Sequence, residues 1–568
     1  MIFDLDKEKV IGKVESVDTA VVIVHVKEPQ LLSSIQVNHL VVIRSSKVGQ
    51  YLIGMVNKIV RKYNVLDVSV EDKDMEESSS YDLVKVTLVG TFIDRIGTKE
   101  NIFKRTLQSV AEIDAECFTI TSETLSNFMG VISRSSSLTQ NPLQIGKYVL
   151  NDTAKAYLDG NKFFQRHAVI AGSTGSGKSF TVATLIEQIA KLKSANAILF
   201  DIHGEYGTIV GDGIKHYKIA GPGDVLADDI MYLPYWLLSY DEMLSLLLDR
   251  SDNNAPNQAM MFSKYVIEKK REYLQSIGNI EMEAQFTIDS PIPYDINSLL
   301  YVLKQKDTEM VPGANNKPKQ GDFYGKLSRF IQRLENKTSD KRLNFMFSSE
   351  KGILDYAYMS KLCEMLLAPT SKAGGVKIIN FSEVPSDVLP LIVSLIARVI
   401  FSVQQWVERD KMHPVALFCD EAHLYIPENA RAGVETSSLS GFERIAKEGR
   451  KYGVALVVIT QRPSEVNRTV LSQANNFVAM RLTNVDDQNV IKKLLPDNLG
   501  NYAEMLPILD IGEALIVGDA SLLPSRIIVD KPEHEPNSAT VNFWDEWSKD
   551  TTENFIEEAV EALRKQSK

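Results

Sequence analysis

The residues with the clearest chemical spacing lie in one short segment. Positions 172–179 read Gly-Ser-Thr-Gly-Ser-Gly-Lys-Ser and fit the pattern G-x-x-x-x-G-K-[ST] in full. An apolar run precedes this segment at residues 168–171, and a helical pattern follows at residues 180–192. Glycines in this setting let backbone N–H groups wrap a phosphate at a helix N-terminus. The predicted nucleotide contacts are Gly172, Ser173, Thr174, Gly175, Ser176, Gly177, Lys178, Ser179 and Thr181.

Two side chains of this loop have separate predicted roles. Lys178 is expected to bind the β- and γ-phosphates, and the Ser179 hydroxyl is expected to hold Mg²⁺. The sequence therefore predicts ATP and Mg²⁺ as the ligands of the loop.

A pair of acids supplies the second part of the predicted site. The apolar run at residues 415–419 ends in Asp420 and Glu421. One acid at the end of a buried strand can orient Mg²⁺ through its water shell, and a second can polarise the water that attacks the γ-phosphate. We assign the first role to Asp420 and the second to Glu421. The alternative is a solvated strand end without function, but adjacent acids beside a phosphate loop favour hydrolysis.

Three further polar segments are candidates for the same site. Gln461 follows the apolar run at residues 454–460 and is expected to sense the γ-phosphate. Arg450 lies in a basic helix end and is a candidate arginine finger for a neighbouring subunit, with Arg444 a weaker one. The alternative for Arg450 is a cation stabilised by the helix dipole. Glu205 either contacts a water or an adjacent subunit, or lies in a loop closed by its own hydrogen bonds.

The elements that must position these residues divide the chain into three parts. Residues 1–150 carry short β-branched runs typical of a small barrel or sandwich, with a polar loop at residues 71–80. Residues 151–530 alternate apolar strands with helices, which predicts an α/β core with a mainly parallel sheet and a helical insertion at about 238–368. Residues 531–568 form a linker and an amphipathic helix, which we expect to pack on its own domain; partner binding is the alternative.

Composition limits the class of protein. The 568 residues are 44% hydrophobic and 24% charged, with a net charge of −11, so a generally basic nucleic-acid binder is excluded. Residues 313–342 are locally basic, with eight Lys and Arg against three Asp and Glu. This segment predicts a phosphate-facing surface, and a solvated helix face is the alternative. Three distant cysteines and the lack of a signal or membrane-spanning segment indicate a cytoplasmic protein. The apolar run at residues 388–401 predicts a buried helix.

Five motifs together resemble the HerA family of the HerA/FtsK motor superfamily. They start at Gly172 (GSTGSGKS), Asp201 (DIHGEY), Asp420 (DEAH), Glu448 (EGRKYG) and Thr460 (TQRP), and their order and spacing also match. The resemblance covers most of residues 151–530, and the first 150 residues are similar only in kind to the family's β-barrel. The tail after Lys531 is not covered.

This resemblance implies a RecA-like core, a homo-hexameric ring and ATP hydrolysis that moves double-stranded DNA through a pore. It also implies work beside a nuclease, with some bacterial relatives paired with nuclease or sirtuin-like effectors in phage defence. Lys178, Ser179, Asp420, Glu421, Gln461 and Arg450 keep the roles assigned above. DNA contacts on residues 317–342 are a further expectation. The rival hypotheses are a nucleotide-controlled scaffold for a partner effector and a secretion or conjugation motor, which the absence of a membrane segment weakens.

Overall fold

The computed structural model describes the chain except residues 1, 4, 6–7, 65–78, 98, 121, 137–140, 313–316, 369–374, 432, 496–499, 539–541, 550–555 and 566–568. The polar loop predicted at residues 71–80 lies almost wholly outside the described residues. The chain forms two compact units, each built from several segments. The first contains Met1–Gln188, Gln461–Ser464 and Ala474–Glu533, and the second contains Ile189–Thr460, Glu465–Gln473 and His534–Lys568.

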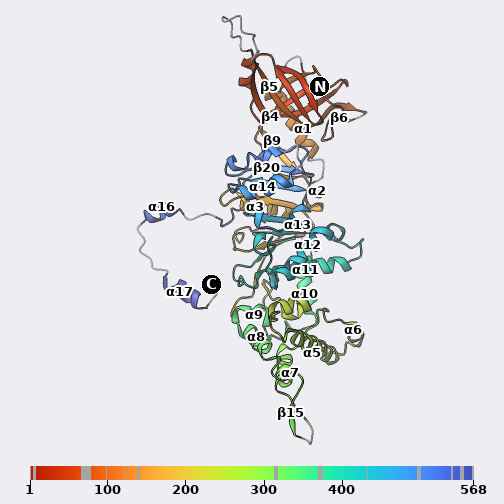
Figure 1. The fold of residues 1–568 in the computed structure, drawn as a ribbon, viewed down its shortest axis with the longest axis vertical. Helices are drawn as coiled ribbons and strands as arrows, with labels where there is room; N and C mark the ends of the chain where they lie inside the picture. The colour runs from red at the N-terminus through yellow and green to blue at the C-terminus, as the bar shows by residue number, and fades with distance from the viewer. Residues whose placement is uncertain are drawn as a thin grey trace, which may run out of the picture. The chain divides into compact units, whose positions relative to one another are not determined.

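The first unit begins with a closed antiparallel barrel (Figure 1). Its six strands follow the order β2-β1-β7-β3-β4-β5, and pairing of β2 with β5 closes the ring. Closure removes the exposed edges that an open sheet of these apolar strands would present. A barrel is thus confirmed over a sandwich. The strands are β1 (Val10–Asp18), β2 (Val21–Val26), β3 (Leu40–Arg44), β4 (Gln50–Asn64), β5 (Ser79–Ile96) and β7 (Glu116–Thr119), with β6 (Lys99–Lys104) added to β5.

The remainder of the first unit carries the phosphate loop. Strand β10 (Ala168–Ala171) pairs in parallel with β19 (Asn476–Met480), and helix α3 (Lys178–Ala190) follows β10. Antiparallel strands continue the sheet from β19 through β20 (Glu513–Gly518), β21 (Ser525–Val529), β8 (Leu143–Tyr148) and β9 (Asn151–Leu158). Strand β8 therefore pairs with β21, although the division at residue 150 grouped it with the barrel. Strand pairing between distant segments leaves no local mark in the sequence.

The second unit contains a parallel sheet with the order β13-β12-β16-β11-β17-β18. Its inner strands are buried almost throughout, as near-continuous Val, Ile and Leu runs predict. The α/β core expected from the sequence is confirmed. The strands are β11 (Ala197–Asp201), β12 (Ile214–Ile219), β13 (Ile230–Met231), β16 (Val376–Asn380), β17 (Val415–Cys419) and β18 (Val454–Thr460).

Two helices of this unit lie between its strands in the chain. Helix α11 (Leu389–Trp406) follows β16, and α12 (Val434–Glu448) connects β17 to β18. Among the described residues, α11 is the one helix whose length and composition would suit a membrane span, and 72% of its apolar window is buried. The buried helix predicted for residues 388–401 is confirmed.

The helical insertion lies between β13 and β16, as predicted. Its helices are α4 (Tyr240–Leu247), α5 (Ala255–Ser276), α6 (Ile280–Gln285), α7 (Ile296–Thr308), α8 (Ser328–Ser339), α9 (Asn344–Phe347) and α10 (Tyr358–Leu367). A two-stranded hairpin of β14 (Met310–Pro312) and β15 (Pro318–Gln320) interrupts them, which the sequence did not predict. An ion pair between half-buried Arg398 and buried Glu242 joins the insertion to the core: the Arg398 guanidinium donates to both oxygens of Glu242, at 2.8 and 2.7 Å.

The tail differs from expectation. Helices α16 (Phe543–Trp547) and α17 (Ile556–Lys565) contain no buried residue, and Trp544 is 80% exposed. The prediction that the tail packs on its own domain is therefore wrong for these described helices. Amphipathic spacing predicts that a face will be covered but does not identify the surface that covers it.

Candidate nucleotide site

The phosphate loop of the first unit has the backbone that its glycines predict. Gly175 and Gly177 have φ angles of +72° and +104°, in the left-handed region where a side chain is strained. A Cβ on Gly177 would also come within 3.0 Å of the Met480 methyl carbon. Helix α3 starts at Lys178, so the loop ends at a helix N-terminus. This is the geometry that directs backbone N–H groups at a bound phosphate.

Backbone hydrogen bonds hold the loop in place. The Ser173 N–H donates to the Arg481 carbonyl at 2.8 Å, and the Thr483 N–H donates to the Ser173 hydroxyl at 3.3 Å. On the other side, the Gly512 N–H donates to the Ser176 carbonyl at 2.9 Å. The loop is thus fixed by the segments that follow β19 and precede β20. Binding of a ligand therefore costs little conformational entropy in this loop.

One hydrogen bond joins the loop to the predicted sensor. The Thr174 hydroxyl donates to the Gln461 side-chain oxygen at 2.5 Å. Residues far apart in sequence are therefore brought together as the assignment of Gln461 to the γ-phosphate requires. The Thr174 hydroxyl thus fixes the position of the Gln461 amide oxygen beside the loop.

Other residues of the loop support a bound anion in different ways. Lys178 and Ser179 are 6% and 9% exposed, as expected for groups aimed at an enclosed ligand. The Ser176 hydroxyl is buried and has no hydrogen-bond partner among the described residues. Thr181 is fully buried, and its hydroxyl donates to the Gly177 carbonyl at 3.1 Å. That bond supports a role for Thr181 in holding the loop, whereas the sequence indicated nucleotide contact.

The second unit places the predicted acids at the end of a buried strand. Asp420 and Glu421 directly follow β17 and are 1% and 3% exposed. Glu421 has a φ of +44°, a left-handed conformation that a non-glycine residue adopts at an energetic cost. Its carboxylate lies 3.3 Å from the His423 ring, which also contacts the Thr460 hydroxyl at 3.4 Å. His423 therefore lies beside the carboxylate that is expected to polarise water. The sequence analysis predicted no role in the site for His423.

A third carboxylate lies near this pair. Asp201, at the end of β11, accepts the Glu205 and Tyr206 N–H groups at 3.0 and 3.1 Å. Burial, with the negative charge of Asp420 adding to it, raises the pKa of Asp201 to about 6. Two close buried carboxylates favour a shared proton or a bound cation. Oxygen ligands are those Mg²⁺ prefers, so the buried Asp420 carboxylate is chemically suited to the ion.

The Glu205 segment takes the second of its two predicted forms. The Glu205 and Tyr206 N–H groups donate to the Asp201 carboxylate and so close the loop at residues 201–206. Gly204 within this loop has a φ of +74°. The Glu205 carbonyl also accepts the Asn537 N–H at 2.7 Å. The loop is therefore ordered by its own hydrogen bonds.

The two arginine candidates differ in their surroundings. Arg450 lies in a short 3₁₀ turn after α12 (Gly449–Tyr452), is exposed, and has no ion-pair or hydrogen-bond partner among the described residues. Arg444 lies over the Phe401 ring, 5.3 Å from its centroid, and 4.0 Å from Glu448. An unengaged guanidinium is what a finger for another subunit requires, so the structure favours Arg450 over Arg444.

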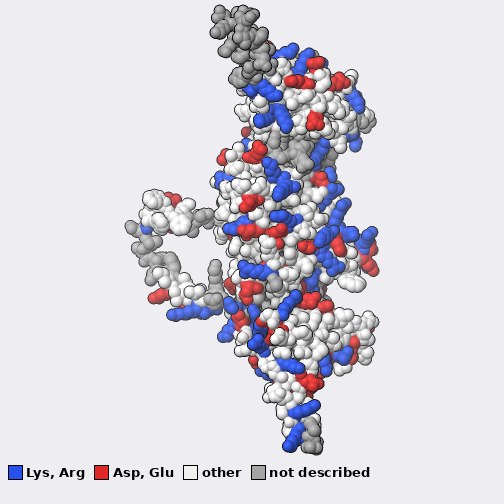
Figure 2. Space-filling view, viewed as in Figure 1, with Lys and Arg blue, Asp and Glu red and all other residues white. Residues whose placement is uncertain are grey.

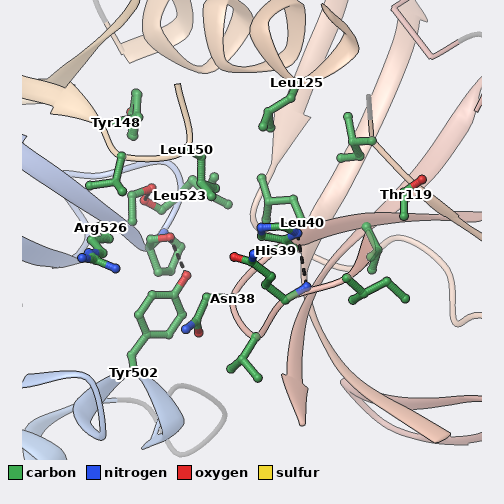
Figure 3. Close-up of a pocket in the computed structure, with 18 of the residues that line it drawn as sticks. Asn38, His39, Leu40, Thr119, Leu125, Tyr148, Leu150, Tyr502, Leu523 and Arg526 are labelled. Atoms are coloured by element: carbon green, nitrogen blue, oxygen red, sulfur yellow. Dashed lines mark hydrogen bonds between the residues drawn. The ribbon is translucent and has the colours of Figure 1, made fainter. Parts of the chain in front are cut away.

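A separate cavity of about 620 Å³ lies in the first unit, away from all the predicted site residues (Figure 3). Barrel residues including Asn38, His39 and Thr119 line one side, and Tyr502 and Arg526 line the other. The Tyr502 hydroxyl donates to the Pro524 carbonyl at 3.1 Å, and burial lowers the pKa of His39. None of the predicted site residues lines this cavity, so it forms no part of the candidate site.

Comparison with known proteins agrees with this site. Residues 143–400 match the family described as "Helicase HerA, central domain". The chain is 28% identical over 415 residues to a probable helicase of Methanocaldococcus jannaschii, covering 72% of this chain and 71% of that one. It is 26% identical over 393 residues to the DNA double-strand break repair helicase HerA of Saccharolobus solfataricus, covering 68% of each.

Among solved structures, the chain is similar to the bacterial conjugative coupling protein TrwB, with a TM-score of 0.45, 14% identity and coverage of 72% of this chain and 93% of that one. It is also similar to VirB4 of Thermoanaerobacter pseudethanolicus, with a TM-score of 0.43, 16% identity and coverage of 70% and 98%. The family match spans the phosphate loop at residues 172–179. Residues 143–400 of the chain are therefore similar to the central domain of helicase HerA and carry the phosphate loop of a P-loop ATPase.

Proposed function

We propose that the protein hydrolyses ATP with Mg²⁺ and uses the energy to move along double-stranded DNA as a ring. The observation that carries the proposal is the buried Asp420–Glu421 pair at the end of β17, in a chain whose phosphate loop is complete. A protein that only holds nucleotide has no need of a second buried carboxylate. The relatives' names, DNA double-strand break repair helicase among them, support DNA as the substrate.

In the proposed mechanism, the chain's own groups divide the work on one ATP molecule. Lys178 and the loop N–H groups bind the β- and γ-phosphates, while Ser179 and Asp420 hold Mg²⁺. Bound Mg²⁺ supplies positive charge against the charge that develops on the phosphate oxygens. Glu421, oriented by His423, accepts a proton from the attacking water.

Gln461 and Arg450 couple hydrolysis to changes elsewhere in the protein and in the neighbouring subunit. Gln461 contacts the γ-phosphate and shifts when it leaves, and Thr174 transmits that change to the loop. Arg450 stabilises the transferred phosphoryl group of a neighbouring subunit, which makes a homo-hexameric ring the form in which each site is complete. A nuclease or sirtuin-like effector and a role in phage defence belong to the same proposal.

A second candidate function is a nucleotide-controlled scaffold that assembles and regulates a partner effector. One observation favours it: α16 and α17 expose Phe543, Trp544 and Trp547, together with Ile556 and Leu563. Exposed tryptophans are frequent anchors of protein–protein interfaces. In a scaffold, hydrolysis would depend on the partner and would be indifferent to DNA.

The experiment that separates the two measures ATP hydrolysis by the full chain with and without blunt duplex DNA, at one stated moderate salt concentration. Salt must be fixed because phosphate-driven binding falls steeply with it. Glu421→Gln is the control that should bind ATP without hydrolysing it. Several-fold stimulation by DNA, absent in the variant, supports the motor. Hydrolysis that depends on Glu421 but ignores DNA refutes it in favour of the scaffold.

A further inference from the structure

The locally basic stretch at residues 313–342 divides into two halves in the structure. Three cations of its second half are neutralised by ion pairs: Arg333 with Asp249 at 2.6 Å, Lys337 with Asp387 at 3.2 Å and Arg342 with Asp340 at 2.8 Å. Each of these three cations thus lies beside an acidic side chain that offsets its charge. For this half, the pairs agree with the alternative given in the sequence analysis, which is a solvated helix face without a phosphate contact.

The first half is different. Lys317, Lys319, Lys326 and Arg329 are exposed, and none has an ion-pair or hydrogen-bonded side-chain partner among the described residues. We call these four residues the hairpin cation cluster. Two neighbouring lysines are excluded from it because each is paired, Lys304 with Glu335 and Lys306 with Glu309. Asp322 is the acid that lies within the cluster's own segment.

The cluster stands on the β14–β15 hairpin and its base. Lys319 pairs with Val311 across the hairpin, and the six residues of the two strands are exposed or half-buried. Figure 2 shows lysine and arginine side chains gathered at the hairpin end of the helical insertion. A short two-stranded ribbon with no apolar face to bury is not stabilised by packing. Burial of apolar surface therefore does not explain why this ribbon extends from the helices of the insertion.

The base of the hairpin is clamped so that the ribbon keeps its direction. Asp307 is 8% exposed, and its two oxygens accept the Leu327 N–H at 2.7 Å and the Ser328 hydroxyl at 2.6 Å. Its carbonyl accepts the Gly325 N–H at 2.9 Å. One buried carboxylate thus ties the end of α7 to the start of α8. The cations are presented on a fixed support, which is what a binding surface needs.

We infer that the hairpin cation cluster is a sequence-independent contact for the phosphates of duplex DNA; the inference rests on the proposed DNA-coupled function. Three of its four members are lysines, flexible point charges suited to backbone phosphates because they impose no planar geometry. A motor that moves along any sequence requires contacts of this kind. A two-stranded ribbon is also narrow enough for the major groove, which is about 12 Å wide.

The test compares two double variants of the full chain that remove the same charge. K317Q/K319Q removes two unpaired cations, and the matched control K337Q/R342Q removes two that are already paired. Affinity for a fluorescent blunt duplex is measured at several salt concentrations. Each lost phosphate contact makes the negative slope of log K against log salt shallower by about 0.9, so K317Q/K319Q should make it shallower by about 1.8. Between 50 and 200 mM salt, the wild type should lose about 12-fold more affinity than this variant.

We expect the slope of log K against log salt to become shallower in K317Q/K319Q and to change little in the control. We also expect both variants to hydrolyse ATP without DNA at the wild-type rate. Thermal unfolding midpoints of the two variants verify that each is folded. An unaltered slope in K317Q/K319Q overturns the inference, as does an equal loss in both variants, which would reflect net charge alone. Wild-type protein that neither binds DNA nor responds to it defeats the proposed function itself. An acidic protein surface would then be the class of partner left for the hairpin.

Discussion

The hydrogen bond between Thr174 and Gln461 gives a sharp test of how nucleotide is sensed. The Thr174 hydroxyl lies 2.5 Å from the Gln461 side-chain oxygen. In the proposed mechanism, this bond orients the Gln461 amide toward the γ-phosphate. Thr174→Val keeps the shape of the side chain and removes the donor. A neutral hydrogen bond contributes about 0.5–1.5 kcal/mol, so kcat should fall about 2- to 12-fold. Because Lys178 still binds the phosphates, KM for ATP should change less than kcat.

The assay is steady-state ATP hydrolysis by the full chain with saturating duplex DNA. Thr174→Ser retains the hydroxyl and should behave as wild type. If the bond acts through Gln461, T174V/Q461A should be no slower than Q461A alone, because the two changes remove one interaction. Wild-type kcat in T174V, or effects of the two changes that simply add, would refute the reasoning.

Three further outcomes follow from other contacts. Arg450→Ala and Lys178→Ala should each abolish hydrolysis, and mixing the two proteins under conditions of subunit exchange should restore part of it; no recovery would mean that Arg450 acts within its own subunit. Arg398→Met should destabilise the second unit by about 3–5 kcal/mol, since Glu242 stays buried without its partner, and an unchanged unfolding midpoint would contradict the importance of this pair. Burial lowers the pKa of Lys270 to about 8 from 10.5. The unfolded chain therefore binds more protons between those values, and wild-type stability relative to Lys270→Met should rise by about 3 kcal/mol as pH increases through this interval; a flat difference would refute the shift.

The parts of the fold that the sequence predicts best are those with continuous apolar runs. Strands β10, β17 and β18 end where the runs at residues 168–171, 415–419 and 454–460 end. Strands that are buried on both faces are continuously apolar and do not alternate between apolar and polar residues. The first polar residue therefore marks the end of each strand. The site residues that follow these strands were predicted for the same reason.

The features that the sequence did not reveal depend on partners distant in the chain or on short polar elements. The ion pair of Arg333 with Asp249 distinguishes this paired cation from the unpaired ones, and the two residues are 84 positions apart in the sequence. Strands β14 and β15 have three residues each and no apolar alternation. The Thr174–Gln461 bond joins residues 287 positions apart. The sequence around these residues has no local hydrophobic periodicity that would predict these features.

The exposed tail shows the converse limitation. The spacing of Ile556, Val560 and Leu563 predicts an amphipathic helix, and α17 is one. The same spacing fits packing on its own domain, on a second copy or on a partner. Periodicity therefore identifies the element but not its neighbour.

The central claim is that hydrolysis moves the protein along duplex DNA, and displacement of a triplex-forming strand from a duplex measures that movement most directly. The account predicts that the wild-type protein displaces the third strand when ATP and Mg²⁺ are present. It predicts no displacement with ADP or by Glu421→Gln, which retains nucleotide binding. DNA-stimulated hydrolysis without displacement of the third strand would contradict the claim.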